Sequence, residues 1–218
     1  MAKEKIVWKQ FGPRIPNVYS KHYMKQLPKK WRSEGNDDEN SPRLYIRNQL
    51  DKLDLPISGG WGYYEGNCVV IDKNDPSVDS SKPFNGVQIE YQFIEKRIYA
   101  ELIVFKPKGH KCSGIKWELL SQKCEVIDGK TYDFLEFKVS YFNDEDWDYL
   151  KKDWEDNDGF KDNPSGLKSH NEERAKRLSL YKGKFCFDIT SFYDLTEGEN
   201  KTLGSYTPEK EGTIFPRR

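Results

Sequence analysis

The clearest pattern along the chain is a strict alternation of apolar and polar residues that follows an Asp-Gly pair. The alternating residues are Leu135, Glu136, Phe137, Lys138, Val139, Ser140 and Tyr141. A period of two indicates a strand that buries one face and leaves the other in water. Asp128-Gly129 favours the tight type I′ turn that joins two antiparallel strands. The pattern therefore predicts a hairpin whose strands are residues 116–127 and 130–142.

A second alternating stretch begins after Gly86 and is harder to interpret. Apolar and polar residues alternate through Val87, Gln88, Ile89, Glu90, Tyr91, Gln92 and Phe93, which favours a strand. From residue 94 to 102 two periods fit the sequence. The residues Ile94, Ile98 and Leu102 share a helical face, whereas Ile98, Ala100, Leu102 and Val104 follow a strand period. We expect a strand, a turn near Glu95-Lys96 and a second strand, with a helix as the alternative for residues 94–102.

Two helices are predicted from their N-terminal residues. Ser41-Pro42 is typical of an N-cap and a first helical residue, and predicts a helix that runs to about Leu53. Asn143 precedes several acidic residues and predicts a helix over residues 143–158, because acidic groups stabilise a helix N-terminus. The apolar residues of this second helix are Trp147, Leu150 and Trp154. Because they recur at helical spacing, we expect the helix to dock on the sheet.

The remaining segments give shorter signals. Residues 68–71 are predicted as a buried strand, and residues 73–86 as a long polar loop. A charged helix is expected over residues 169–180, with Gly183 as its breaker. Residues 185–193 are expected to form another strand. Strands occur in runs with helices between them, and this order predicts an α+β fold with a mostly antiparallel twisted β-sheet and two or three helices packed on it.

The length of 218 residues fits a single domain, residues 1–218. Within it we expect a basic, irregular N-terminal arm (1–41) and a polar C-terminal tail (196–218). Aromatic residues make up 14% of the chain and all hydrophobic residues only 35%. The core is therefore expected to consist of Trp, Tyr and Phe more than of Leu and Val.

Charge and cysteine usage exclude some classes of protein. Lys plus Arg number 36 and Asp plus Glu also number 36, so net charge does not favour nucleic acid as a partner. No apolar run approaches the roughly 20 residues of a membrane helix, and we expect no membrane partner and no leader peptide. The cysteines are Cys68, Cys112, Cys124 and Cys186. Their scattered positions predict free thiols in a reducing cytoplasm, hence a cytoplasmic protein.

A cluster of glycines and aromatic residues is the first candidate for a ligand- or partner-binding site. The candidate residues are Gly60, Trp61, Gly62, Tyr63, Tyr64, Glu65 and Asp72. The glycine spacing resembles a phosphate loop, but it is one residue too long, and a strand rather than a helix follows it. Two interpretations remain. The stretch is a tight turn whose aromatic residues seal the core, or it forms a groove that holds a partner's side chain or a flat ligand.

Metal and hydrolytic centres have weak support. The histidines His22, His110 and His170 are too far apart in sequence to indicate a metal site, and no cofactor is predicted. Residues 72–75 are expected to form an Asx-rich turn. Glu136-Phe137-Lys138 is an ExK on a predicted strand, and some metal-dependent nucleases use such a pair. The acids considered for this alternative, a hydrolase or nuclease on a sheet face, are Glu136, Asp128, Glu90 and Asp72.

The N-terminal arm offers a third possibility. Basic and aromatic residues of the kind that neutralise phosphates and stack on bases are Lys21, Lys25, Lys29, Lys30, Trp31 and Arg32. The acidic segment 143–158 of the same chain can instead satisfy this charge internally. Because no acid–base or metal constellation is visible, we favour a small cytosolic protein without catalysis that binds another protein. The hydrolase or nuclease and the nucleic-acid binder are the alternatives.

Overall fold

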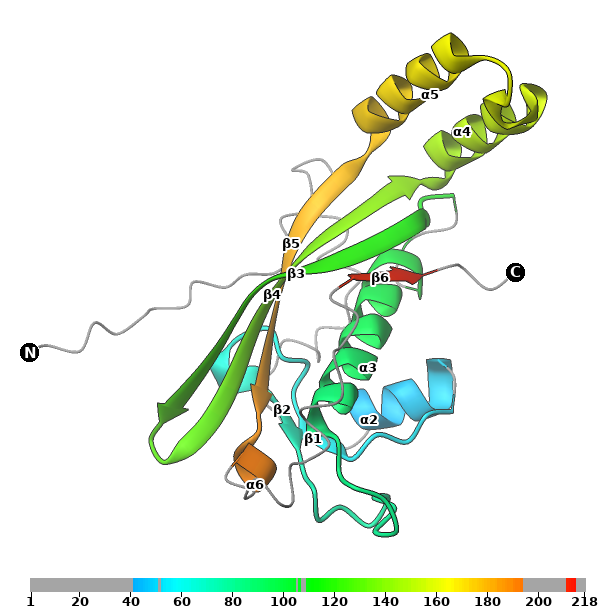
Figure 1. Cartoon of the computed structure of the whole chain (residues 1–218). Coiled ribbons are helices and arrows are strands. Elements are labelled where there is room, and N and C mark those ends of the chain that lie inside the picture. The colour runs from blue at the N-terminus through cyan, green and yellow to red at the C-terminus, as the bar shows by residue number, and fades with distance from the viewer. Residues whose placement is uncertain (1–40, 51, 105, 107–108, 194–210, 215–218) are drawn as a thin grey trace, which may run out of the picture.

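A six-stranded sheet organises the molecule. The computed structural model describes residues 41–50, 52–104, 106, 109–193 and 211–214. The strands are β1 (Ile57–Gly59), β2 (Val69–Ile71), β3 (Cys112–Ile127), β4 (Lys130–Asn143), β5 (Ser179–Asp188) and β6 (Glu211–Ile214). Their order across the sheet is β1-β2-β5-β4-β3-β6 (Figure 1). The α+β class is confirmed, but the sheet is mixed because β2 and β5 run parallel.

The predicted hairpin is confirmed as β3 and β4. Ile127 pairs with Lys130, and both turn residues have positive φ, 50° at Asp128 and 78° at Gly129. Such angles are those of the type I′ turn that Asp-Gly favours. On the other side of β3, the short strand β6 pairs antiparallel with residues 115–118. Part of the segment expected as a polar tail is therefore an edge strand of the sheet.

The expected strand pair between residues 87 and 104 is wrong, and the helix given as the alternative for residues 94–102 is the correct interpretation there. This segment is the helix α3 (Gly86–Tyr99), continued by a π-helical turn, η5 (Ala100–Val104). The Asn85 side chain caps it by accepting a hydrogen bond from the Gln88 amide at 3.0 Å. Residues of the strand-like alternation and residues between them are both buried, among them Ile89, Glu90 and Tyr91. The less buried residues Gln88, Gln92 and Lys96 do recur at helical spacing, but the charged residues Glu90 and Arg97 are buried on the opposite side, and they obscure the helical period in the sequence.

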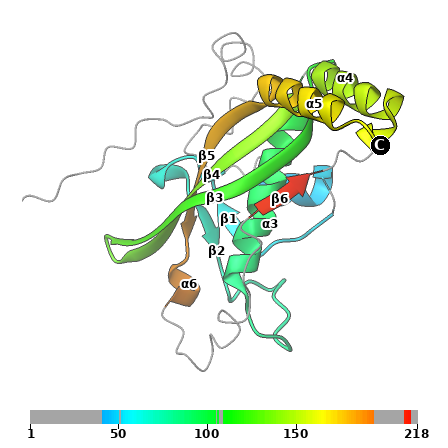
Figure 2. The ribbon, with the colours of Figure 1, turned by 45° about the horizontal axis from the view of Figure 1, so that its top comes forward.

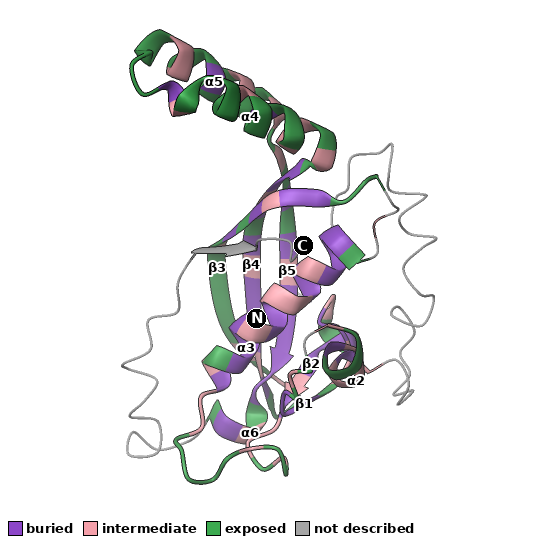
Figure 3. Cartoon of the chain, turned by 90° about the vertical axis from the view of Figure 1, so that its right-hand side faces the viewer, coloured by how far each residue is buried: buried purple, intermediate pink, exposed green. Residues whose placement is uncertain are grey.

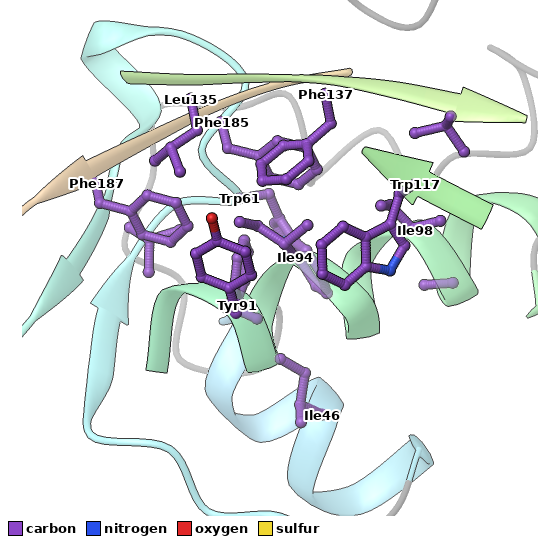
Figure 4. Close-up of a cluster of buried hydrophobic side chains, with 14 of the residues drawn as sticks. Ile46, Trp61, Tyr91, Ile94, Ile98, Trp117, Leu135, Phe137, Phe185 and Phe187 are labelled. Atoms are coloured by element: carbon purple, nitrogen blue, oxygen red, sulfur yellow. The ribbon is translucent and has the colours of Figure 1, made fainter. Parts of the chain in front are cut away.

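The core lies between α3 and one face of the sheet, which we call the inner face. Figure 4 shows Tyr91, Ile94 and Ile98 of α3 directed toward strand residues that include Trp117 and Phe137. Aromatic rings meet edge to face across this layer, as Phe137 does with Trp117 at 5.5 Å and with Phe185 at 5.6 Å between ring centroids. Edge-to-face contacts are the favoured geometry for aromatic pairs. The core is thus rich in aromatic residues, as the composition indicates.

The first helix begins as predicted and is shorter than expected. Ser41 is the N-cap and accepts a hydrogen bond from the Leu44 amide at 3.2 Å. The helix comprises α2 (Pro42–Tyr45) and a π-helical turn, η3 (Ile46–Leu50). Ile46 is fully buried against the core.

Two further elements are short. They are the 3-10 turn η4 (Glu65–Asn67) and the helix α6 (Thr190–Tyr193). The helix α6 replaces the end of the strand expected over residues 185–193.

A pair of helices connects β4 to β5. These are α4 (Asp144–Asp156) and α5 (Pro164–Arg177), with a 3-10 turn, η6 (Asp158–Phe160), between them. Asn143 caps α4 as predicted, accepting a hydrogen bond from the Asp146 amide at 2.8 Å. The expectation that α4 docks on the sheet is correct only for the start of the helix, where the ring of Trp147 lies 5.6 Å from that of Phe142 on β4. Figures 1 and 2 show both helices projecting beyond the strand ends, and Figure 3 shows that most of their surface is exposed.

The helices pack on each other because their apolar residues meet between them. Trp154 contacts the rings of Phe160 and His170 at centroid distances of 5.9 and 5.5 Å. The buried residues of the pair are Leu150, Phe160 and His170. α5 starts earlier than predicted, and β5 runs through Gly183, which therefore does not break the chain there.

The prediction of four free thiols is also wrong. Cys68 and Cys186 form a disulfide with a Cα–Cα distance of 4.8 Å, although they are separated by 118 positions in sequence. The parallel pairing of β2 with β5 brings the two residues together, and sequence spacing gives no sign of it. Cys112 is a buried free thiol and Cys124 an exposed one. Among the residues that the structure describes, no helix is long and apolar enough to cross a membrane.

Candidate functional site: a pocket beside the glycine-aromatic loop

The segment between β1 and β2, residues 60–68, forms a closed loop that we call the glycine-aromatic loop. Its two sides are joined by hydrogen bonds from the Gly60 amide to the Cys68 carbonyl at 2.9 Å and from the Gly62 amide to the Asn67 carbonyl at 2.6 Å. A further bond from the Cys186 amide to the Gly62 carbonyl, at 3.0 Å, attaches the loop to β5. The backbone of the loop is therefore held in one conformation.

Two of the glycines are required by this geometry. Gly62 has a φ of 71°, and a Cβ atom there would lie 3.0 Å from the Cys186 carbonyl oxygen. At Gly60 a Cβ atom would collide with the side chain of Asn67. A positive φ and a close approach of backbone are the two situations in which only glycine fits without strain. These glycines serve the turn, as the first interpretation of the stretch proposes.

Trp61 points into the core and lines no groove. Its side chain is 2% exposed and lies between the rings of Tyr45 and Phe93, at centroid distances of 5.7 and 6.0 Å. The Trp61 amide donates to the side-chain oxygen of Asn67 at 3.0 Å. Figure 4 shows the indole among the core side chains beside α3. Trp61 therefore stabilises the loop through its contacts with the core.

A buried arginine joins the loop to α3. Arg97 is 1% exposed and donates from Nη1 to the carbonyl oxygens of Trp61 and Gly62 at 3.0 and 3.1 Å. Its Nε donates to Glu101 Oε1 at 2.9 Å, and the Tyr63 hydroxyl donates to the same oxygen at 2.7 Å. Burial raises the pKa of Tyr63 well above its ordinary value, with a further contribution from the Glu101 charge. The phenol therefore remains a hydrogen-bond donor at neutral pH.

Next to this anchored loop, the sheet carries a pocket on its outer face, the face opposite α3. The residues that line it are Gly62, Tyr63, Tyr64, Glu65, Ser121, Lys123, Phe134, Leu135, Glu136, Lys184, Phe185 and Cys186. Phe134 and Cys186, with Cys68, form a small apolar cluster separate from the main core. This cluster gives the pocket an apolar floor. Tyr64 is half-buried and Glu65 exposed at the loop side.

The charged groups at the pocket rim compensate one another. Glu136 Oε1 lies 2.9 Å from Lys182 Nζ, and Glu136 Oε2 lies 3.5 Å from Lys184 Nζ. The hydrogen bond from Lys182 lowers the pKa of Glu136, so this carboxylate is ionised at neutral pH. On β3, Lys123 forms an ion pair with Glu125. The rim therefore combines both signs of charge around an apolar floor.

The acids considered for a metal-dependent hydrolase do not converge. Asp128 is in the turn of the β3–β4 hairpin, and the first β4 residue, Lys130, is already six positions, or about 20 Å along the strand, from Glu136. Glu90 is buried on α3, on the inner side of the sheet. Asp72 accepts a hydrogen bond from the Asn74 amide at 2.9 Å, as expected for an Asx-rich turn. In the described part of the chain, no three His, Cys, Asp or Glu residues form a group that could hold a metal ion.

Only some of the binding residues predicted from the sequence lie at the pocket. Gly62, Tyr63, Tyr64 and Glu65 line the pocket, whereas Gly60, Trp61 and Asp72 do not. The basic residues of the N-terminal arm, Lys21, Lys25, Lys29, Lys30, Trp31 and Arg32, lie outside the described residues.

Sequence reasoning missed the apolar floor. Phe134 and Cys186 occupy outward positions of their strands, and each stands directly beside an inward apolar residue, Leu135 and Phe185. Such adjacent apolar residues interrupt the alternation, and this is the signal that could have indicated the floor.

Comparison with known proteins adds no information on function. Models of protein families, curated protein sequences and solved structures were all compared with this chain, and none of them matches it.

Proposed function

We propose that this protein acts without catalysis, by binding another protein through the pocket beside the glycine-aromatic loop. The observation that carries the proposal is the combination of an apolar floor with a rim of compensated charges. Phe134 and the Cys68–Cys186 disulfide form the floor, and Lys184 and Glu136 contribute to the rim. Concave apolar surfaces with a few polar groups at their margin are the usual form of a binding site.

The chemistry of the pocket favours an apolar or aromatic side chain as its occupant. Tyr64 is half-buried and offers a ring face beside the floor. Aromatic contacts of this kind supply much of the binding energy at protein interfaces. The neighbouring Lys184 and Glu65 can pair with polar groups of the partner's backbone and flanking residues. Because the loop is held by Arg97 and by the disulfide, its ordering costs little free energy on binding.

A peptide-display experiment tests the proposal. The full chain, immobilised, is exposed to a displayed library of random peptides, and enriched peptides are synthesised and their affinities measured by calorimetry. We expect a consensus that contains one aromatic or large aliphatic residue. Tyr64→Ala is expected to weaken binding by about tenfold or more, because it removes an aromatic contact beside the apolar floor. Tyr149→Ala on α4, which is 49% exposed, is the matched control and is expected to leave affinity unchanged.

Nuclear magnetic resonance gives the position of the bound peptide independently. The expected chemical-shift changes fall on the amides of Gly62, Glu65 and Lys184. The proposal is wrong if no peptide is enriched, or if the shifts map to another surface and Tyr64→Ala binds as tightly as the wild type.

A further inference from the structure

Among the described residues, the outer edge of β3 is paired over only part of its length. β3 extends from Cys112 to Ile127, and β6 pairs with it over residues 115–118. In the part of the chain that the structure describes, no strand pairs with residues 119–127 on that side. An edge of this kind presents unpaired backbone N–H and C=O groups that a further strand can satisfy.

Several side chains along this edge are exposed to solvent, and Glu125 is half-buried. Leu120 is 42% exposed, Val126 is 69% exposed, and Cys124 is an exposed thiol. Lys123 and Glu125 lie on the same, outer face of the strand and form an ion pair with each other. The edge thus carries one positive and one negative charge that flank Cys124 symmetrically.

We infer that two copies of this chain pair antiparallel through the β3 edge, about a twofold axis at Cys124. An antiparallel pair related by a twofold axis perpendicular to the sheet must be centred on one residue, because paired side chains have to point to the same face. Centring on Cys124 places Lys123 opposite Glu125 of the partner subunit, and the reverse pair forms by symmetry.

The neighbouring registers are excluded by charge. A twofold axis at Lys123 places two lysines opposite each other, and an axis at Glu125 places two glutamates opposite each other. Like charges directly opposite in a ladder are destabilising, whereas opposite charges stabilise it. Of these three registers, charge favours the one centred on Cys124, which alone forms two ion pairs and in which Gln122 faces Val126 of the partner subunit.

The dimer has a consequence for the pocket. Lys123 lines the pocket and also belongs to the proposed interface. In the dimer Glu125 of the partner subunit reaches the pocket margin, and both pockets open on the same face of a continuous sheet. The inference itself does not depend on what the pocket binds.

Charge reversal tests the interface. The self-association of the full chain is measured by sedimentation velocity over a concentration series. We expect Lys123→Glu alone and Glu125→Lys alone to raise the dimer Kd by about tenfold or more, since two attractive pairs become repulsive. The double variant K123E/E125K is expected to restore association, because the pairs form again with their signs exchanged. Lys138→Glu, on the same face of β4 where Lys138 pairs with Glu118, is the control and should not change the Kd.

Cross-linking tests the register. A short bis-maleimide is expected to join two chains through Cys124, and Cys124→Ser should abolish the product, because the other free thiol, Cys112, is buried. A chain that stays monomeric up to its solubility limit overturns the inference. So does a dimer whose Kd is the same in both single charge reversals, since that dimer uses another surface.

Discussion

The guanidinium carbon of Arg97 lies 3.8 Å from the centroid of the Tyr63 ring and 4.1 Å from the centroid of the Phe185 ring. Stacking and hydrogen bonding together make Arg97 the link between α3 and the glycine-aromatic loop. We expect Arg97→Met to destabilise the fold by about 3–5 kcal/mol, because it leaves the Glu101 carboxylate buried without its cation. Urea unfolding measures the change. Arg174→Met, at an exposed position of α5, should cost far less, and equal losses would contradict the role of Arg97.

The disulfide ties the same loop to β5. Reducing it, or replacing it in Cys68→Ser/Cys186→Ser, releases a constraint across 118 positions of the chain. We expect a loss of about 2–5 kcal/mol in the free energy of unfolding, chiefly because the unfolded chain gains freedom. Thermal unfolding with and without dithiothreitol checks this. Cys112→Ser/Cys124→Ser serves as the control, because it keeps the disulfide and the reductant should destabilise it as much as the wild type. In Cys68→Ser/Cys186→Ser the reductant should have no further effect.

Two buried carboxyl groups make stability depend on pH. Burial raises the pKa of Asp133 to about 6, and burial together with the Asp133 charge raises the pKa of Glu90. Glu90 Oε2 and Asp133 Oδ1 have no hydrogen-bond partner among the described residues. A carboxyl whose pKa is raised on folding stabilises the fold while protonated, and this contribution is lost as pH rises from about 4 through the folded pKa.

Glu90→Gln is therefore expected to be more stable than the wild type at pH 8, with a difference that shrinks toward about pH 4, because the amide cannot ionise. Chemical denaturation at a series of pH values measures the difference. Glu118→Gln, an exposed position on β3, should follow the wild-type curve. A Glu90→Gln curve parallel to that of the wild type would show that Glu90 does not titrate in this range.

We expect His170→Ala to destabilise the helical pair α4–α5 and to leave the rest of the fold unchanged. His170 is buried between Trp154 and Phe160, and its Nδ1 lies 2.6 Å from Asp153 Oδ2. His170→Ala removes one of the few buried side chains of the pair. Hydrogen exchange should then speed up in α4 and α5 while the amides of β4 and β5 keep their rates. Uniform acceleration across the chain would mean that the helices and the sheet unfold as one unit.

The sequence predicted those parts of the fold that local chemistry determines. The Asp-Gly turn, the strands beside it and the caps at Ser41 and Asn143 were all found because a single residue or a period of two specifies them. The helix α3 was missed because the charged residues Glu90 and Arg97 are buried and interrupt its apolar face, so that the polar stripe of Gln88, Gln92 and Lys96 did not stand out as a helical period.

Only part of the candidate site could be predicted from the sequence, because its residues come from one loop and from separate strands. Tyr63, Tyr64 and Glu65 belong to one continuous loop, and their composition attracted attention. Phe134 and Cys186 come from separate strands and reach the pocket only through the pairing of β4 with β5. The disulfide has the same origin, since pairing between distant strands leaves no trace in the spacing of cysteines.

The position of the helical pair in the strand order carries a last consequence. Tyr141 of β4 and Ser179 of β5 are already paired neighbours where the helices leave the sheet. Paired strand ends lie close enough for a turn of a few residues to join them. The segment from α4 to α5 is thus an insertion at a hairpin bend, and the chain can be shortened or replaced there while the register of every strand stays the same. That bend is the natural place at which to engineer a fusion, a label or a minimal form of this protein.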